Sequence, residues 1–333
     1  MSPWPALLTL AFRAPSPHNV QPWRVRQVDD HTIELFLEKA RTLPEEDVTG
    51  SFLLLTMGLF LESLALLAAN RGYAIEFERA HEAAWYRAEH LRTVELAMLP
   101  FATVRLRPDD AARSAFSDST FAARRTSRLA YAPEPLPCDT EEQLARVAAR
   151  FGHRFTTVRD PARIERLLEW NIAAVFEDLN QPGYHDELTS WFRPGARQAR
   201  ATRDGLDARS LHQPPIDVWL AAHAPWILRV PGLGRVFARR YRRQIGPVAT
   251  LGILAGAFWE PEDAFQTGRA LLHFWLTVTE LGDYLHPYGN LVTNKGAAAN
   301  VARETGVRDA WLVFKIGRSE SAQFRLPFKD KAL

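Results

Sequence analysis

The chain has 333 residues, well above the ~150 of one ordinary domain, so two domains or two packed halves are expected. Hydrophobic residues make up 47% and charged residues 24%, which excludes disordered, collagen-like and disulfide-stabilised proteins, and a net charge of +2 argues against nucleic-acid binding as the default. The lone cysteine, Cys138, excludes an internal disulfide and a cysteine-based zinc site and indicates a reducing compartment.

The first part of the chain is predicted to hold a hairpin, a long helix and further strands. Residues 25–37 alternate unevenly around a polar turn at 29–31, which indicates a short hairpin. The stretch 52–69 (FLLLTMGLFLESLALLAA) is an apolar helix that ends near Gly72, a residue type suited to the position beyond a helix C-terminus. Beyond it we expect strands at 75–77 and 94–106 and a helix at 109–123.

The stretch 52–69 is also the one candidate for a membrane span. It approaches the ~20 apolar residues that a span needs, but Glu62 and Ser63 interrupt it. Because a helix that is apolar all round also occurs at the centre of a large soluble protein, we expect a buried helix. The first ten residues carry two prolines and no basic residue, unlike an export signal. The expectation is a cytoplasmic protein without a membrane or nucleic-acid partner.

The second part repeats this layout around an insertion. The predicted elements are helices at 140–150, 161–178 and 262–281 and strands at 155–158 and 311–316. Between 181 and 261 the stretch is rich in proline and glycine and contains the arginine-rich run Arg235–Arg243 (RVFARRYRR). The strands are few and short beside much helix, which favours an α+β fold over a doubly wound parallel sheet.

The common catalytic signatures are absent from the sequence. There is no phosphate loop of the GxxxxGKS kind, no HExxH, no GxGxxG after a strand and no GxSxG elbow. The ten histidines lack the spacing of metal ligands, so no metal site is expected.

Two local clusters could carry chemistry. Residues 14–23 (APSPHNVQPW) hold three prolines, which keep the backbone open and present Ser16, Asn19 and Gln21 as short polar groups. Such a segment could line one edge of a flat heteroaromatic ligand, or it could be a stiff turn before the first strand. Residues 124–128 (RRTSR) gather three guanidinium groups and two hydroxyls, an arrangement that suits phosphate. A solvated basic stretch at a helix end is the alternative.

Together these clusters resemble the FMN-dependent nitroreductases. The first resembles the PSxxNxQPW segment of that family, and the second resembles the RxSxR/K segment that starts a nitroreductase subunit. Family members are homodimers whose FMN sites each take one segment from either subunit. Here the order is inverted, because the PSxxN-like segment precedes the RxSxR-like segment along the chain. A fused, duplicated pseudo-dimer would show this order. The chain therefore resembles the internally duplicated, Acg-like branch of the superfamily.

This resemblance implies a nitroreductase-like α+β fold of two similar halves around long central helices. The halves would be 1–115 and 116–333, and the second would carry a lid-like insertion at about 181–261. With one copy of each motif, the chain would build one FMN site, as a monomer or as a further homodimer.

The resemblance also implies the cofactor contacts. Residues expected along the flavin ring and ribityl chain are Pro15, Ser16, Pro17 and Asn19. Those expected at the phosphate are Arg124 and Thr126, with Arg125 and Ser127 in the same strip, and Arg325 from a KxRLP-like tail in which Gln323 replaces a common lysine. Arg128 would lie near the N1/O2 edge of the ring, where a positive charge stabilises reduced flavin. Tyr288 and Gly289 would form the turn whose backbone N–H faces flavin N5.

The implied function is that of an FMN-dependent oxidoreductase. NADH or NADPH would pass hydride to flavin N5, and an electron-poor acceptor such as a nitro compound or a quinone would then be reduced. No side chain is assigned a catalytic role, because the flavin carries the chemistry. Three alternatives stay open: a protein that stores FMN without turnover, a flavin-dependent dehydrogenase of a specialised pathway, and membrane-surface binding through Arg235–Arg243.

Overall fold

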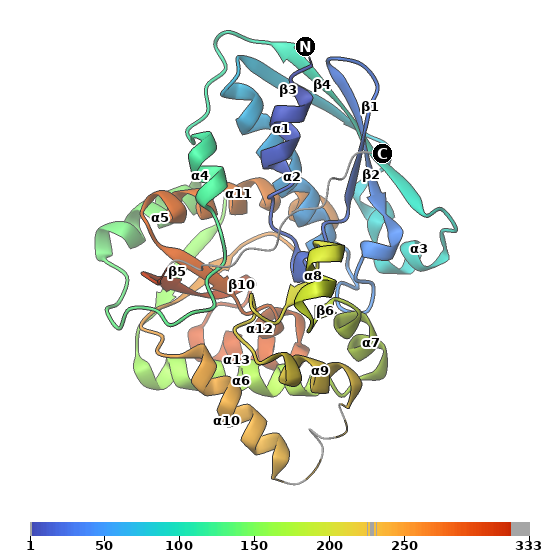
Figure 1. Ribbon diagram of the computed structural model, residues 1–333. Coiled ribbons are helices and arrows are strands. Elements are labelled where there is room, and N and C mark those ends of the chain that lie inside the picture. Colours follow the sequence, from blue (N-terminus) through green and yellow to red (C-terminus); the bar gives the residue numbers. More distant parts are fainter. Residues whose placement is uncertain (1, 225, 227–229, 231, 321–333) are drawn as a thin grey trace. The chain divides into compact units, whose positions relative to one another are not determined.

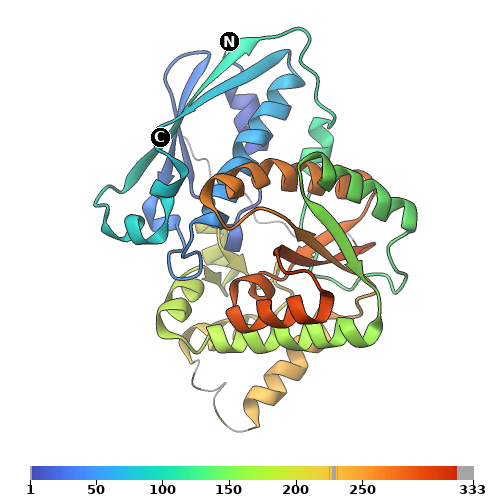
Figure 2. The same cartoon turned by 180° about the vertical axis from the view of Figure 1, so that it is seen from behind.

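Two antiparallel four-stranded sheets organise the chain, as seen in a computed structural model that describes residues 2–224, 226, 230 and 232–320 (Figures 1 and 2). Each sheet belongs to its own compact unit. Unit 1 comprises residues 2–124 and Phe258–Leu276, and unit 2 comprises Arg125–Ala257 and residues 277–320. The described fold is therefore α+β, as predicted, whereas the predicted division into halves at residue 115 stays a prediction.

The sheet of unit 1 has the strand order β1-β2-β4-β3. Its strands are β1 (Trp23–Gln27), β2 (Thr32–Glu38), β3 (Tyr73–Arg79) and β4 (Met98–Pro108). The predicted hairpin is confirmed, because β1 and β2 pair with Trp23 opposite Leu37 and the Asp29 carboxylate accepts the His31 N–H in the turn. Alternate residues of β2 are buried, as expected of a strand with one face on a core.

The helices of unit 1 include two that were not expected in this form. The helices are α1 (Trp4–Ala11), α2 (Ser51–Ala69), α3 (Ala88–Thr93), α4 (Asp118–Ala123) and most of α11 (Pro261–Glu280), with short 3₁₀ turns at Pro17–Asn19, Lys39–Arg41 and Ala83–Tyr86. Helix α1 was not predicted. The predicted helix at 109–123 is wrong over its first nine residues, because Asp109 accepts the Ala111 N–H in a turn and Ser117 caps α4 by accepting the Thr120 N–H.

Helices α2 and α11 pack backbone against backbone in unit 1. A Cβ added to Gly58 would lie 2.2 Å from the Phe265 carbonyl oxygen, and one added to Gly268 would lie 2.3 Å from the Leu55 carbonyl oxygen. By length and hydropathy (2.1) α2 could cross a membrane, but 78% of that window is buried inside the protein. Glu62, which interrupts the apolar run, is 8% exposed and contacts α11. These contacts agree with the expected core helix.

The sheet of unit 2 has the strand order β5-β8-β10-β9. Its strands are β5 (Arg154–Val158), β8 (Leu251–Ala255), β9 (Tyr284–Pro287) and β10 (Ala310–Gly317). The predicted strands at 155–158 and 311–316 are confirmed. Strand β8 is wholly buried and pairs with both β5 and β10, although it falls inside the predicted insertion. The part of residues 181–261 outside the sheet therefore ends before Leu251.

The helices of unit 2 fall into two groups. One group lies outside the predicted insertion, and the other lies within it. The predicted helices at 140–150 and 161–178 are confirmed as α5 (Cys138–Arg150) and α6 (Pro161–Asp178). Helix α6 lies beside α12 (Asn290–Thr293) and α13 (Lys295–Thr305) (Figure 1). The insertion contains α7 (Pro182–Ser190), β6 (Phe192–Arg193), α8 (Ala196–Thr202), β7 (Leu206–Asp207), α9 (Pro215–His223) and α10 (Leu233–Ile245).

Candidate functional site

The proline-rich segment of unit 1 has a strained, internally bonded backbone. His18, Asn19 and Gln21 all adopt positive φ angles, of 46°, 57° and 51°. The Ser16 hydroxyl accepts the Gln21 N–H at 3.1 Å, and the Gln21 side-chain amide donates to the side-chain Oδ1 atom of Asn19 at 3.2 Å. Three non-glycine residues in this sparsely populated region within four positions are typical of a functional loop. Pro15 and Pro17 lie in the same loop, so the structure keeps these predicted residues together.

Arg124 lies next to this loop within unit 1. Its guanidinium donates to the Arg13 carbonyl oxygen at 2.7 Å and lies 4.7 Å from the centre of the Trp275 ring. Arg13 in turn donates to the Ala122 carbonyl oxygen at 3.3 Å. The start of the arginine strip and the start of the proline-rich loop are thus brought together. The contact of Arg124 with a phosphate stays a prediction.

The rest of the arginine strip belongs to unit 2. Thr126 forms a bridge with Leu285 of β9, which fixes the strip against one edge of the sheet. Arg125 is partly buried. Arg128 donates to the Ser210 carbonyl oxygen at 3.3 Å, and burial lowers the pKa of its guanidinium, although Tyr241 and Tyr131 oppose the shift. Among the described residues, no carboxylate pairs with Arg128.

Lys315 is a buried cation near Arg128 that the sequence analysis did not single out. It lies in β10 with 1% of its surface exposed, and its ammonium donates to the carbonyl oxygens of Leu129 at 2.9 Å and Ile245 at 3.2 Å. The ammonium also lies 4.4 Å from the centre of the Tyr131 ring. Burial, and then the charge of Arg128, lower the pKa of Lys315 to about 7. The available signal was a lysine, one of only five in the chain, inside the apolar strand WLVFKIG.

Tyr288 and Gly289 follow β9 in the same unit. The Tyr288 N–H donates to the Val313 carbonyl oxygen at 2.7 Å, so this N–H is used in the fold. The buried Tyr288 hydroxyl and the His286 Nδ1 atom have no hydrogen-bond partner in the part of the chain that the structure describes. Burial, followed by Arg128, holds the pKa of His286 well below its usual range. A Cβ added to Gly289 would meet no atom within 4 Å, so space adjoins its backbone.

These groups of unit 2 fit one edge of a flavin. The ring has carbonyl and nitrogen acceptors along its pyrimidine edge, and it gains negative charge on reduction. The chain supplies a guanidinium and an ammonium without a described carboxylate partner, and a buried hydroxyl without a hydrogen bond. Gln323 and Arg325 lie outside the described residues. No group of three or more His, Cys, Asp or Glu side chains among residues 2–320, apart from the gaps noted above, could hold a metal ion.

Two solved structures show distant similarity to the chain. The FMN-dependent nitroreductase NfnB from Mycobacterium smegmatis, in complex with NADPH, is 18% identical over 64% of this chain and 93% of that one, with a TM-score of 0.39. A second structure, named "putative nitroreductase from anabaena variabilis", is 12% identical over 95% of this chain and 88% of that one, with a TM-score of 0.45. Both TM-scores lie below 0.5, so neither structure carries an argument about this chain.

No family model matches the chain, but curated relatives from Mycobacterium tuberculosis do. "Putative NAD(P)H nitroreductase Rv3131" is 32% identical over 189 residues, which cover 56% of this chain and 49% of that protein. "Putative NAD(P)H nitroreductase acg" is 32% identical over 184 residues, which cover 55% and 51%. The chain spans about half the length of the curated relatives it matches. This similarity confirms the resemblance to nitroreductases that the two motifs predict.

Proposed function

We propose that the protein is an FMN-binding oxidoreductase of the nitroreductase type, which transfers hydride from NADH or NADPH to an electron-poor acceptor. The observation that carries this proposal is that unit 2 holds two neighbouring cations, Arg128 and Lys315, whose hydrogen bonds go to backbone carbonyl groups and not to a described carboxylate. Burying a charge without a counter-ion costs free energy unless a ligand supplies the opposite charge. The two relatives named as NAD(P)H nitroreductases support the same reading.

Within unit 2, the side chains would bind and orient the ring. When bound, FMN would supply the hydride chemistry at N5. Arg128 would hold the N1/O2 edge and match the charge that the ring gains on reduction. Lys315 would act indirectly, because its ammonium holds the carbonyl groups of Leu129 and Ile245 and so fixes the backbone next to Arg128. Gly289 would leave space for the ring beside the main chain.

Within unit 1, the proline-rich loop would offer Ser16 and Asn19 to the ring and the ribityl chain. The loop suits this role because its strained backbone is held by its own hydrogen bonds and needs little ordering on binding. We further propose that the two units, each with a four-stranded sheet and a long helix, are the halves of a duplicated chain.

The absorption spectrum of the purified protein tests the proposal most directly. We expect flavin bands with one FMN per chain, and anaerobic NADH or NADPH should bleach them. A nitro compound or a quinone should then restore the bands. A bound flavin that neither nicotinamide bleaches would favour storage without turnover, and bleaching only by an oxidisable substrate would favour a dehydrogenase. A colourless protein that takes up no FMN would contradict all three.

A variant pair tests the role of Arg128 without measuring turnover. Arg128→Gln should weaken FMN binding by roughly 10- to 100-fold, because a hydrogen bond to a charged group contributes ~1.5–3 kcal/mol. Quenching of FMN fluorescence on binding measures this affinity. Arg107→Gln is the matched control, since Arg107 is 59% exposed and pairs with the exposed Glu76. Equal affinities of the two variants would remove Arg128 from the proposed site.

A further inference from the structure

Exposed apolar side chains concentrate in one stretch of the insertion. Of the eleven large hydrophobic residues exposed in the described chain, six lie between residues 216 and 236: Ile216, Trp219, Trp226, Val230, Leu233 and Val236. Trp226 is 62% exposed and Val236 is 58% exposed. Single exposed apolar residues are ordinary, but such a concentration is typical of an interaction surface.

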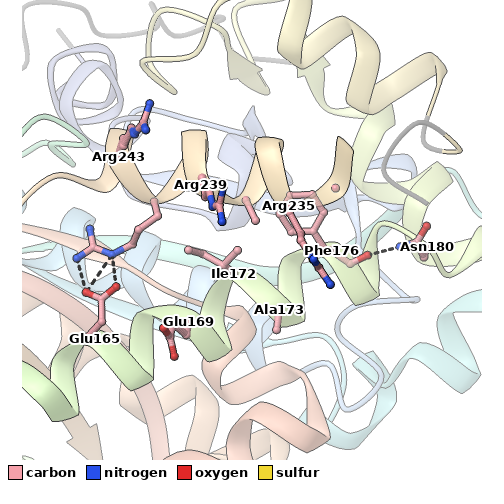
Figure 3. A pocket seen from close by; sticks show the side chains of 12 residues that line it. Glu165, Glu169, Ile172, Ala173, Phe176, Asn180, Arg235, Arg239 and Arg243 are labelled. Atoms are coloured by element: carbon pink, nitrogen blue, oxygen red, sulfur yellow. Dashed lines mark hydrogen bonds and ion pairs between the residues drawn. The ribbon is translucent and has the colours of Figure 1, made fainter. Parts of the chain in front are cut away.

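Helix α10 contains the last two of these residues, Leu233 and Val236, and carries a basic face. Its thirteen residues include five arginines and no carboxylate. Arg235, Arg239 and Arg243 are spaced four apart on successive turns and are exposed. They line the groove between α10 and α6, which Glu165 and Glu169 of α6 also line (Figure 3). No carboxylate among the described residues pairs with these three. The other two arginines bind within unit 2, Arg240 to Asp217 at 3.2 Å and Arg242 to Glu165 at 2.5 Å.

Helix α10 is attached to unit 2 mainly through its C-terminal end. Ile245 is its one buried residue, and its carbonyl oxygen accepts the Lys315 ammonium. Along the rest of its length an open groove of about 730 Å³ separates α10 from α6, with Ile172 and Phe176 on the α6 side (Figure 3). Leu233 and Val236, in the first turns of α10, are both exposed.

We propose that α9 and α10 form a peripheral docking surface for a bilayer that contains anionic phospholipid. The apolar tip, defined as Trp226, Val230, Leu233 and Val236, would enter the boundary between headgroups and acyl chains. The basic face, defined as Arg235, Arg239 and Arg243, would pair with lipid phosphates. A bilayer suits this surface better than nucleic acid, because a phosphate backbone would match the arginines but leave the apolar tip in water.

Sedimentation with vesicles tests this surface on the full chain. We expect binding to phosphatidylcholine vesicles that contain phosphatidylglycerol, weaker binding at higher salt, and little binding to phosphatidylcholine alone. Arg239→Gln with Arg243→Gln should weaken binding by roughly thirty-fold, because each basic residue near an anionic surface contributes roughly five- to sixfold. Leu233→Ser with Val236→Ser should also weaken binding and should make the remainder more sensitive to salt.

Matched controls separate this surface from general charge and from the flavin site. Arg197→Gln with Arg200→Gln removes the same charge from exposed positions of α8 and should leave vesicle binding within about twofold. Thermal unfolding confirms that all variants fold. Equal binding to neutral vesicles, or equal loss in the α8 control, would overturn the proposal. So would binding to a DNA duplex in place of vesicles, or arginine variants that change only FMN affinity.

Discussion

Two sites of buried charge, one in each unit, differ in how the chain balances them. In unit 1, the Glu62 carboxylate of α2 accepts hydrogen bonds from Arg269 at 2.9 Å and His273 at 2.7 Å, both on α11. In unit 2, Arg128 and Lys315 have no described carboxylate partner. The fold supplies the counter-ions of the first site, whereas the described residues supply none at the second. Under the proposed function, an anionic ligand would provide the missing negative charge there.

The titration behaviour of the two sites shows the same contrast. Burial opposes ionisation of Glu62, but the hydrogen bonds from His273 and Arg269 outweigh it, and the pKa of the carboxyl group lies below its usual value. At Lys315, burial and the neighbouring Arg128 act together, so the pKa of the ammonium falls to about 7. The fold favours the charged form of Glu62 and opposes the charged form of Lys315.

The largest effect is expected at the close contact between helices α2 and α11 of unit 1, which carry Glu62 and its two partners. Gly58→Leu would drive a side chain into the Phe265 carbonyl group, so α2 and α11 could not keep their contact. We expect a loss of at least about 3 kcal/mol in the free energy of unfolding, measured with urea and circular dichroism.

Gly289→Ala is the matched glycine control, because an added Cβ there has no atom within 4 Å and the backbone is already helical, with φ of −54°. Its stability should stay within about 0.5 kcal/mol of the parent protein. A Gly58→Leu protein that unfolds with the parent would show that the helices do not need this contact.

Removing the charge of Glu62, which Arg269 and His273 balance, should lower the free energy of unfolding by less than Gly58→Leu does. Glu62→Gln keeps the shape of the side chain but loses the charged hydrogen bonds to Arg269 and His273, at an expected cost of about 2 kcal/mol in the free energy of unfolding. The control Glu76→Gln, in an exposed pair with Arg107, should cost less than about 0.5 kcal/mol. Equal losses would mean that burial of Glu62 adds nothing to its interactions.

Removing the charge of Arg128, which no described carboxylate balances, should raise the free energy of unfolding, whereas Glu62→Gln lowers it. Arg128→Met takes away a partly buried cation that no described carboxylate balances, so the FMN-free protein should gain about 1 kcal/mol in the free energy of unfolding. The same variant should lose the stabilisation that added FMN gives the parent protein. Thermal unfolding with and without FMN measures both effects. If the FMN-free variant is less stable than the parent protein, Arg128 stabilises the fold, as Glu62 does.

The sequence predicts the local elements of both units better than it predicts these two sites. The hairpin around 29–31 and the helix of 161–178 follow from periodicity and turn residues, which act over a few positions. Glu62 reads only as an interruption of an apolar helix, because its partners lie more than 200 residues further along the chain. Lys315 is hidden for the same reason, since its ammonium binds carbonyl groups far away in the sequence. The two recognised motifs supply Arg128, but its lack of a counter-ion appears only in three dimensions.

The last expected effect is the pH dependence that Lys315 adds to the free energy of unfolding. Its side chain faces Arg128, Tyr131 and His286, with a folded pKa of about 7 against ~10.4 in the unfolded chain. Between these values the unfolded state binds the extra proton, so stability should rise with pH, by up to about 1.4 kcal/mol per pH unit. Below about pH 7 both states are protonated and this contribution becomes constant.

Lys315→Met should remove this slope. In urea unfolding, the free energy of unfolding of the variant relative to the parent protein should therefore be lower at about pH 9 than at about pH 7. Bound FMN should flatten the slope of the parent protein, because an anionic ligand raises the pKa of a nearby ammonium and narrows the gap to the unfolded value. Parallel curves for the parent and the variant would show that Lys315 stays charged in the fold. It would then be balanced as fully as Glu62, and the contrast between the two units would rest on Arg128 alone.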